Sequence, residues 1–247
     1  MKTIIIIFLG VLMTGSKLQA DFLADQMKYQ RVRTAISEKE AVVKEKLNSE
    51  NIKFNELEII ITVFKQEKLL EIYAKNKSDI EYKKVVSYEI CQSSGELGPK
   101  RKEGDGQVPE GFYFIEKFNP VSNFYLSLGI NYPNESDRKI GTGRLGGDIF
   151  IHGNCVTIGC VPMTDEIIKE IYLYALYAKN NGQERIKAYF FPFRMSDENM
   201  AKYKEEYKAD ISLINFWENL NAGYDMFVKN KRELKFSVDN KGRYIFN

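Results

Sequence analysis

The sequence predicts an α+β protein, with a mainly β centre that contains one long helix and with helical segments at both ends. Short runs of β-branched and aromatic residues recur between polar turns over residues 57–152, as strands do. After residue 163 the apolar residues change to a helical spacing, and charge-rich segments with helical spacing flank the centre. The chain has 247 residues, of which 44% are hydrophobic and 28% charged, which is typical of a globular protein.

Residues 1–20 have the order of a secretory signal. Lys2 gives a positive start, residues 4–13 form an apolar run, and the small Ala20 precedes Asp21. The run is too short for a comfortable membrane span, and no cysteine lies near it, which argues against a lipid anchor. An uncleaved anchor is the alternative. We therefore expect residues 1–20 to be a signal peptide and the mature protein to be exported to a periplasm.

The charge balance argues against one class of partner. The chain has 36 basic and 34 acidic side chains, and cleavage after Ala20 would remove Lys2 and Lys17 and leave equal numbers. A protein with so little net charge does not bind nucleic acid by bulk attraction, so no nucleic-acid partner is expected. Beyond the signal no apolar run is long enough to cross a bilayer, so no stable membrane span is expected after its removal.

The first two segments after the signal differ in pattern. Residues 21–56 are rich in charge and place apolar residues at helical spacings, so we expect an N-terminal helical segment that packs on the next domain. Residues 57–195 form the expected central domain, with a loop rich in glycine, lysine and proline over residues 95–111. The strands expected in this domain are residues 57–64, 69–73, 85–90, 112–118, 124–130, 148–152 and 186–191.

One helix is predicted inside the central domain. Thr164 is a good N-cap, and Asp165 and Glu166 follow in the first turn, where the helix dipole favours acids. An apolar stripe runs to Ala178, and the helix is expected to stop at the Asn-Asn-Gly of residues 180–182.

The C-terminal extension, residues 196–247, is predicted to be mainly helical. Two helices are expected within residues 197–230. Residues 234–238 and 244–246 then flank an Asp-Asn-Lys-Gly turn, which predicts a terminal hairpin.

The chain contains one histidine, His152, which lies eight residues before Cys160. Imidazole takes and returns protons near neutral pH, and a thiol needs such a neighbour to become the attacking thiolate. The strand that carries His152 ends at Gly153, where the chain can turn, and residues 157–160 lead back toward the helix start at Thr164. This reversal can place Cys160 within hydrogen-bonding reach of the imidazole. We interpret the pair as a nucleophile and its base.

The residues beside the cysteine suit acyl transfer. Gly159 removes side-chain bulk next to the nucleophile, so a substrate carbonyl can approach the backbone closely. The amides of Gly159 and Cys160 are candidates for an oxyanion hole, in which one donor is typically worth about 2.7 to 4 kcal/mol. The nearby helix start is expected to add a modest positive potential that favours the thiolate.

The cysteines also allow two interpretations without catalysis. Cys91, His152, Cys155 and Cys160 together match the ligand set of a structural zinc site. Against zinc, the spacing lacks a tight cysteine knuckle, Cys91 lies far away in an expected strand, and export disfavours reduced thiolates. The second interpretation is a structural disulfide, Cys91–Cys155 or Cys155–Cys160. Otherwise Cys155 is a redox partner of Cys160 or, as we favour, a small buried residue. An odd number of cysteines leaves at least one thiol unpaired in a monomer.

At this point the sequence resembles a known family. His152-Gly153 followed by Thr157-Ile158-Gly159-Cys160 is similar to the signature of the L,D-transpeptidase catalytic domain, also called the YkuD-type domain. That signature runs His-Gly, a spacer, Ser or Thr, any residue and Gly-Cys. The resemblance covers about residues 57–195. The further segments that resemble the YafK-type branch are residues 95–100, 103–105, 108–113, 131–134, 163–165 and 191–195.

The resemblance implies a β-rich catalytic domain and a cysteine acyl transferase that acts on peptidoglycan stem peptides, without cofactor or metal. By this analogy Cys160 attacks the carbonyl of a diaminopimelate residue, and His152 accepts and donates the proton. The carbonyl of Gly153 would orient the imidazole, and the amides of Gly159 and Cys160 would hold the oxyanion. An amine then takes the thioester, or water hydrolyses it. Members of the YafK-type branch are associated with hydrolysis that releases a lipoprotein from the wall.

The sequence departs from the family pattern in two places. Pro162 occupies the position where many members carry an arginine that contacts the donor substrate, and the spacer between His152 and Cys160 is shorter than in the commonest members. Three residues in the polar loop before the His152 strand are candidates for substrate contact, although exposed loop residues are more often only solvated. These candidates are Tyr132, Arg138 and Arg144.

Overall fold

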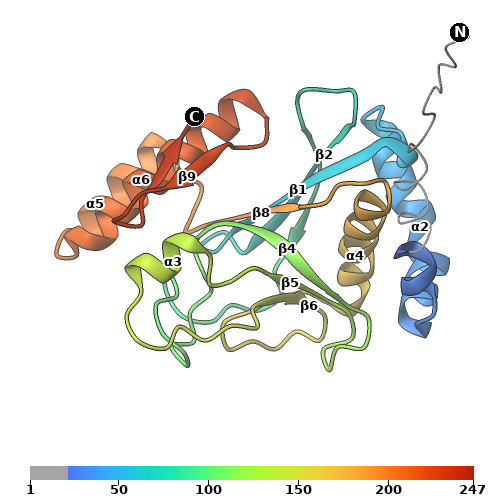
Figure 1. The fold of residues 1–247 in the computed structure, drawn as a ribbon, viewed down its shortest axis with the longest axis horizontal. Coiled ribbons are helices and arrows are strands. Elements are labelled where there is room, and N and C mark those ends of the chain that lie inside the picture. The colour runs from blue at the N-terminus through green and yellow to red at the C-terminus, as the bar shows by residue number, and fades with distance from the viewer. Residues whose placement is uncertain (1–21) are drawn as a thin grey trace, which may run out of the picture.

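The computed structural model describes residues 22–247, so the signal peptide expected over residues 1–20 lies outside the described residues. An eight-stranded mixed sheet in the order β3-β2-β1-β8-β4-β5-β6-β7 forms the centre. Figure 1 shows α2 and α4 on one side of the molecule and α5, α6 and β9 on the other. The strands of the sheet are β1 (Leu57–Phe64), β2 (Leu69–Asn76), β3 (Lys83–Glu89), β4 (Gly111–Asn119), β5 (Ser127–Ile130), β6 (Phe150–His152), β7 (Val161–Pro162) and β8 (Lys187–Phe191).

The helices expected in the two flanking segments and after Thr164 are present, and a short helix over residues 135–140 is an addition that the sequence did not predict. The expected N-terminal helical segment is interrupted: residues 22–27 are helical, residues 28–29 form a turn and a bend, and α2 begins at Gln30. The α+β class is confirmed, and within residues 22–247 no helix is long and apolar enough to cross a membrane. The remaining elements are α2 (Gln30–Ser49), η1 (Phe54–Glu56), α3 (Glu135–Ile140), α4 (Asp165–Asn180), α5 (Asp197–Glu206), α6 (Ile211–Asn230), β9 (Phe236–Val238) and β10 (Tyr244–Phe246).

Strand β1 is buried on both faces, which explains its unbroken apolar sequence. It pairs antiparallel with β2 and parallel with β8, so it lies in the interior of the sheet. Alternate side chains of the strand contribute to two separate hydrophobic clusters, one under α2 and α4 and the other under the C-terminal helices. The first cluster contains Leu57, Ile59, Ile61 and Val63, and the second contains Ile60 and Phe64.

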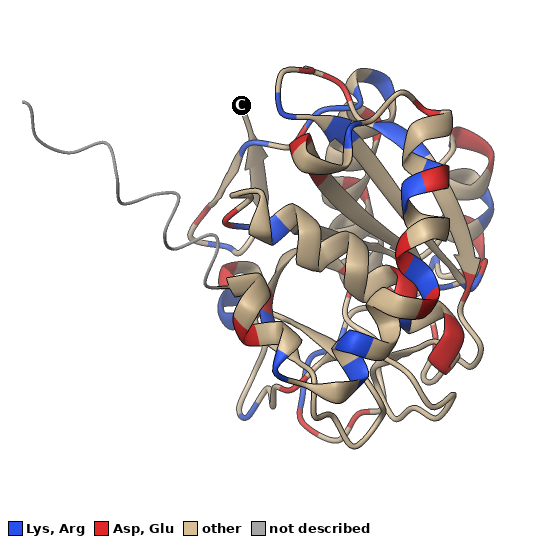
Figure 2. Cartoon of the chain, turned by 90° about the vertical axis from the view of Figure 1, so that its right-hand side faces the viewer, with Lys and Arg blue, Asp and Glu red and all other residues tan. Residues whose placement is uncertain are grey.

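Helix α4 is buried almost all round, beyond the one-sided stripe that the sequence predicted. Every residue from 168 to 178 is buried, because the sheet covers one side of the helix and α2 covers the other. Two buried charged residues of α4 are paired with α2: the Glu170 carboxylate lies 2.6 Å from Lys46 Nζ, and Lys169 Nζ lies 2.5 Å from Glu38. Figure 2 views this side, where basic and acidic residues are interspersed along the helices.

Three expected elements differ from the structure. Strand β5 starts at Ser127 instead of residue 124, because Tyr125 has a left-handed φ of 69° that ends the extended conformation. Strand β6 starts at Phe150 instead of residue 148, because Asp148 has a φ of 54°. The expected polar loop before β6 contains helix α3, which begins at a capping box formed by Asn134 and Asp137.

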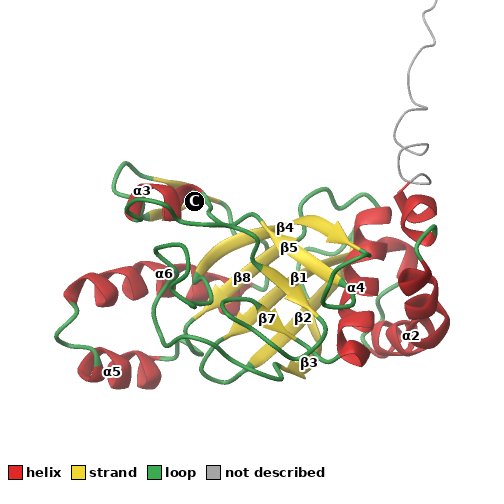
Figure 3. Ribbon diagram, turned by 90° about the horizontal axis from the view of Figure 1, so that it is seen from below, coloured by secondary structure: helices red, strands yellow, loops and turns green. Residues whose placement is uncertain are grey.

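The C-terminal extension is tied to the sheet by a buried carboxylate. Glu110 is fully buried, and its two oxygens accept hydrogen bonds from Lys65 Nζ at 2.9 Å and Trp217 Nε1 at 2.9 Å. Lys65 follows β1, Trp217 lies in α6, and Glu110 immediately precedes β4. The Glu110 carboxylate therefore joins three parts of the chain. Figure 3 shows α6 beside one end of the sheet.

Replacement of the indole donor tests this link. We expect Trp217→Phe to lower the free energy of unfolding by about 1–3 kcal/mol, because a buried carboxylate oxygen loses its partner. Urea unfolding followed by circular dichroism measures the change. Tyr203→Phe is the matched control in the same cluster, since its hydroxyl makes no hydrogen bond within residues 22–247. Equal unfolding free energies for the two variants would contradict the assignment.

Candidate active site

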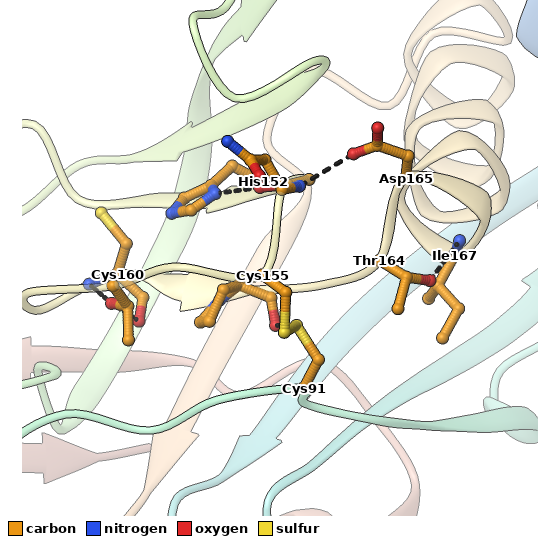
Figure 4. Close-up of a disulfide and its surroundings, with 11 residues drawn as sticks. Cys91, His152, Cys155, Cys160, Thr164, Asp165 and Ile167 are labelled. Atoms are coloured by element: carbon orange, nitrogen blue, oxygen red, sulfur yellow. Dashed lines mark hydrogen bonds between the residues drawn. A yellow bond between two sulfur atoms is a disulfide. The ribbon is translucent and has the colours of Figure 1, made fainter.

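His152 and Cys160 lie on neighbouring parallel strands. His152 ends β6, Cys160 immediately precedes β7, and the register pairs Ile151 with Val161. Continued by one residue, this register places Cys160 opposite Phe150, whose amide N lies 3.4 Å from Cys160 Sγ. Residues two apart on a strand share a face, so the thiol and the imidazole lie on one side of the sheet. Figure 4 shows both side chains on that side.

The imidazole of His152 is held in one orientation. Its Nδ1 lies 2.6 Å from the carbonyl oxygen of Gly153. A carbonyl oxygen only accepts, so we assign the proton to Nδ1, which leaves the lone pair of Nε2 available as a base. Burial lowers the pKa of His152 below its ordinary value, against an opposing effect of the Gly153 hydrogen bond. The ring is therefore neutral at neutral pH, as a proton acceptor has to be.

The thiol of Cys160 is protonated in the resting structure. Burial raises the pKa of Cys160, while the Phe150 amide lowers it, and the charges of Asp148 and Lys100 act in opposite directions. Loss of water on burial is the largest of these effects, and the thiolate-favouring potential expected from the helix start stays a prediction. Within residues 22–247 the thiol makes its hydrogen bonds to the backbone of Phe150 and Asp148, and none to the imidazole. Proton transfer between the two side chains therefore requires the thiol to exchange these backbone contacts for one to the ring.

Glycine is required at positions 153 and 159, because a side chain at either position would lie too close to neighbouring atoms. A Cβ on Gly153 would lie 2.5 Å from Asp165 Oδ1 and 3.0 Å from the carbonyl oxygen of Phe124. Gly159 has a φ of 134°, which L side chains rarely adopt, and its Cβ would lie 3.1 Å from the carbonyl oxygen of Gln107. The Gly159 requirement therefore reflects backbone geometry as well as access for substrate.

The start of α4 fixes the turn after His152. Thr164 caps the helix by accepting a hydrogen bond from the amide of Ile167. Asp165 Oδ1 accepts a hydrogen bond of 2.8 Å from the amide of Asn154, which has a left-handed φ of 56°. The sequence indicated Asp165 only as a first-turn acid, and its contact with the His-Gly turn was missed.

Thr157 organises the turn that carries Cys160. Its Oγ1 accepts hydrogen bonds from the amides of Gly159 at 3.1 Å and Cys160 at 2.9 Å. The same hydroxyl donates to the carbonyl oxygen of Cys160 at 2.8 Å. The two amides expected to hold an oxyanion are thus directed at Thr157 in this structure. An oxyanion has to share or replace that acceptor, so the oxyanion role of Gly159 stays a prediction.

Cys91 and Cys155 form a disulfide with a Cα–Cα distance of 5.7 Å, and Cys160 is the free cysteine. Cys155 is exposed, so the favoured expectation of a small buried residue was wrong. Cys91 lies just after β3, and the bond joins it to the loop between His152 and Cys160. The disulfide removes two of the four ligands that the zinc interpretation needs, and it leaves the thiol of Cys160 available.

A pocket adjoins the free thiol. It lies between the turn after β1, the segment that follows β3, and Cys160 with Val161. Lys65 is already bonded to Glu110, while Lys68 is exposed at the pocket. The other lining residues are Val63, Gln66, Ile90, Gln92, Ser93, Ser94, Gly95, Glu96, Leu97 and Val108.

The structure does not bring the three candidate substrate residues to this pocket. Tyr132 is buried, and its hydroxyl lies 3.3 Å from the carbonyl oxygen of Lys100. Arg138 lies on α3 and borders a separate groove beside the C-terminal hairpin. Arg144 is 84% exposed at its side chain and pairs with Glu103 at 2.7 Å. Their role in substrate binding stays a prediction.

One neighbour of the imidazole was missed by the sequence analysis. The ring of Phe124 lies against that of His152, with centroids 4.6 Å apart and planes inclined by 31°. Phe124 is 40% exposed, whereas His152 is 1% exposed. The apolar sequence around Phe124 indicated only a strand, and no local signal pointed to this contact.

Residues 58–181 match the L,D-transpeptidase catalytic domain, YkuD, and this segment contains both His152 and Cys160. The chain therefore belongs to the family of L,D-transpeptidase catalytic domains, which acts on peptidoglycan. Over 189 residues the chain is 39% identical to the Escherichia coli K12 protein named "Putative L,D-transpeptidase YafK", covering 76% of this chain and 73% of the relative. The protein of the same name in Escherichia coli O157:H7 matches equally. The predicted family resemblance is confirmed.

Two solved structures are similar to the chain in fold. One is the helical cell shape determining protein Pgp2 from Campylobacter jejuni, at 18% identity and a TM-score of 0.45, covering 79% of this chain and 80% of that one. The other is Bd1075 of Bdellovibrio bacteriovorus, at 18% identity and a TM-score of 0.39, covering 72% of this chain and 74% of that one.

Removal of the imidazole tests the pairing of His152 with Cys160. We expect His152→Ala to slow alkylation of Cys160 by iodoacetamide at pH 7 by about 100-fold, the lower range for loss of a general base. At pH values above the raised pKa of the thiol the two rates should converge, because hydroxide then removes the proton. Cys160 is the free cysteine, so mass spectrometry of the adduct reports on it directly. A pH profile identical to that of the unaltered protein would count against the pairing.

The disulfide can be tested by a double substitution. Cys91→Ser with Cys155→Ser should lower the free energy of unfolding by roughly 2–4 kcal/mol, because the bond closes a loop with a sequence separation of 64 residues. Guanidinium unfolding of the oxidised protein and of the double variant measures the difference. A loss below about 1 kcal/mol would show that the bond does not constrain the unfolded chain.

Proposed function

We propose that the chain is an exported, periplasmic cysteine acyl transferase that acts on peptidoglycan stem peptides through a thioester at Cys160. One observation carries the proposal: a free thiol lies on the same side of the sheet as an imidazole whose Nδ1 is fixed by the Gly153 carbonyl. The neutral ring can take a proton at Nε2, and the neutral thiol can supply one. Membership of the L,D-transpeptidase family supports this choice of substrate class.

In the first half-reaction, Nε2 of His152 takes the proton from Cys160 as the sulfur attacks the carbonyl carbon of a diaminopimelate residue. The carbonyl oxygen gains negative charge, and the amides of Gly159 and Cys160 turn from Thr157 Oγ1 to hold it. As the tetrahedral intermediate collapses, the bond to the leaving amine breaks and His152 returns its proton to that amine. The result is a thioester on the sulfur of Cys160, beside a His152 ring that is again neutral.

In the second half-reaction, an amine or water attacks the thioester carbon. His152 takes a proton from the attacking group and gives it to the sulfur that leaves. An amine acceptor gives a cross-link or a protein attachment, whereas water gives hydrolysis. An L,D-endopeptidase or amidase that releases a wall-linked lipoprotein shares the first half-reaction and differs only in the acceptor.

The pocket beside Cys160 is the proposed site of the acyl-donating stem peptide. Its apolar residues suit the carbon chain of a peptide side group, and the exposed ammonium of Lys68 suits a carboxylate of the stem. Pro162 stands where many family members carry an arginine, and its side chain has no charge with which to contact the donor substrate. Lys68 supplies a positive charge at the pocket beside Cys160 instead. No cofactor takes part in these steps.

Mass spectrometry of the protein with peptidoglycan tetrapeptide fragments tests the proposal. We expect a covalent acyl adduct on Cys160, and products that require Cys160 whether or not an amine is added. An added amine that appears in the product indicates transfer, and incorporation of solvent oxygen alone indicates hydrolysis. Cys160→Ala is the control. Product formation by that variant, or fragment binding without any mass change, would overturn the acyl-enzyme and favour a non-catalytic wall-binding module.

Substitution of Lys68 tests the pocket. Lys68→Met should raise the KM for a tetrapeptide donor about tenfold with little change in kcat, since a contact made equally before and during reaction affects binding alone. Lys77→Met, which removes an exposed lysine beyond β2 and outside the pocket, is the matched control. An unchanged KM in Lys68→Met would separate this lysine from donor binding.

A further inference from the structure

The loop between β4 and β5 covers one face of the catalytic imidazole. Phe124 lies in this loop, and its ring stands between the buried ring of His152 and the solvent. The carbonyl oxygen of Phe124 also approaches Gly153 closely, at 3.0 Å from the position of a Cβ. The position of this loop therefore affects both the ring of His152 and the turn that orients it.

The loop is held in a conformation that it would not adopt alone. Tyr125 has a φ of 69°, a left-handed value that costs a bulky residue about 1–3 kcal/mol unless the surroundings maintain it. Within the loop, the amide of Phe124 donates to Ser122 Oγ at 3.1 Å. A second local bond joins the amide of Val121 to Asn119 Oδ1 at 3.2 Å, and neither bond involves Tyr125, so its restraint has to come from elsewhere in the fold.

Lys169 of α4 contacts the Tyr125 ring, with its Nζ 5.7 Å from the ring centroid, but Arg31 of α2 is the residue that also binds the backbone of the loop. Its Nη1 donates to the carbonyl oxygen of Ser122 at 2.5 Å and to that of Tyr125 at 2.6 Å. Its guanidinium carbon lies 5.4 Å from the centroid of the Tyr125 ring, within the range of a cation–π contact. The two carbonyls lie on either side of Phe124, so one guanidinium holds both ends of the segment that presents the aromatic ring.

We propose that Arg31 is a positioning residue for His152, acting through the 122–125 loop and the ring of Phe124. The inference rests on the proposed function only in taking His152 as the base. Arg31 lies outside residues 58–181, the part that matches the catalytic domain. The N-terminal helix thus completes the active site although it contributes no reacting group.

The position of Phe124 has a measurable effect on the imidazole. Burial is the main cause that lowers the pKa of His152. The titratable groups on the elements around the ring are Asp165 on α4, Asp148 before β6 and Cys160 before β7, and the substitutions below leave all three in place. Exposure of the ring to water should therefore raise its pKa toward the ordinary value.

NMR titration of the imidazole tests the proposal, because the chain has a single histidine and gives a single imidazole signal set. We expect Phe124→Ala and Arg31→Met to raise the pKa of His152, and Phe124→Leu, which keeps an apolar cover, to raise it less. Each variant that raises the pKa should also slow acylation of Cys160 by a carbapenem, about tenfold for a displaced catalytic group.

Arg33→Met is the matched control. Arg33 lies on the same helix and donates to the carbonyl oxygens of Met27 and Lys28, away from the loop. Arg33→Met removes the same positive charge as Arg31→Met and should leave the titration of His152 unchanged. The double variant separates position from charge: Arg31→Met should add no further shift to Phe124→Ala, whereas a purely electrostatic effect of Arg31 would persist there.

The proposal is overturned if Arg31→Met titrates like Arg33→Met, or if its shift adds fully to that of Phe124→Ala. Should Phe124→Ala fail to fold, Phe124→Leu and Arg31→Met decide the question. The titration needs no turnover. A shift in Arg31→Met together with an unreactive unaltered protein would retain the positioning role and reject the proposed function.

Discussion

The contact between His152 Nδ1 and the carbonyl of Gly153 is the interaction on which the site depends. It fixes the proton on one nitrogen and leaves the other as the base. The contact exists because Gly153 has no side chain: a Cβ there would collide with Asp165, which itself anchors the turn through the amide of Asn154. The start of α4 therefore helps to fix the turn whose carbonyl orients the ring of His152.

The remainder of the fold restrains the two loops that meet at this ring. The Cys91–Cys155 disulfide holds the loop between His152 and Cys160, and Arg31 holds the loop that carries Phe124. Both restraints come from segments remote in sequence. Because the ring is buried, the thiol is half-buried and both are neutral, the site relies on position more than on a preformed ion pair.

Local patterns in the sequence predicted much of this structure. The bounds of β1 and the cap of α4 at Thr164 follow from apolar runs and capping chemistry that neighbouring residues contain. Cys160 and His152 could be singled out as candidates because the chain uses histidine once and has an odd number of cysteines. Helix α3 was missed although Asn134 and Asp137 have capping-box spacing. The disulfide partner, the stacking of Phe124 on His152 and the raised pKa of Cys160 depend on contacts between distant segments and on burial, which no local pattern contains.

The tautomer of His152 is the most direct test of the account. Nitrogen-15 NMR of the uniformly labelled protein at neutral pH distinguishes a ring protonated at Nδ1 from one protonated at Nε2 or at both. The structure predicts a neutral ring with its proton on Nδ1, because the Gly153 carbonyl can only accept. A proton on Nε2, or a doubly protonated ring, would leave no base facing Cys160 and would contradict the account.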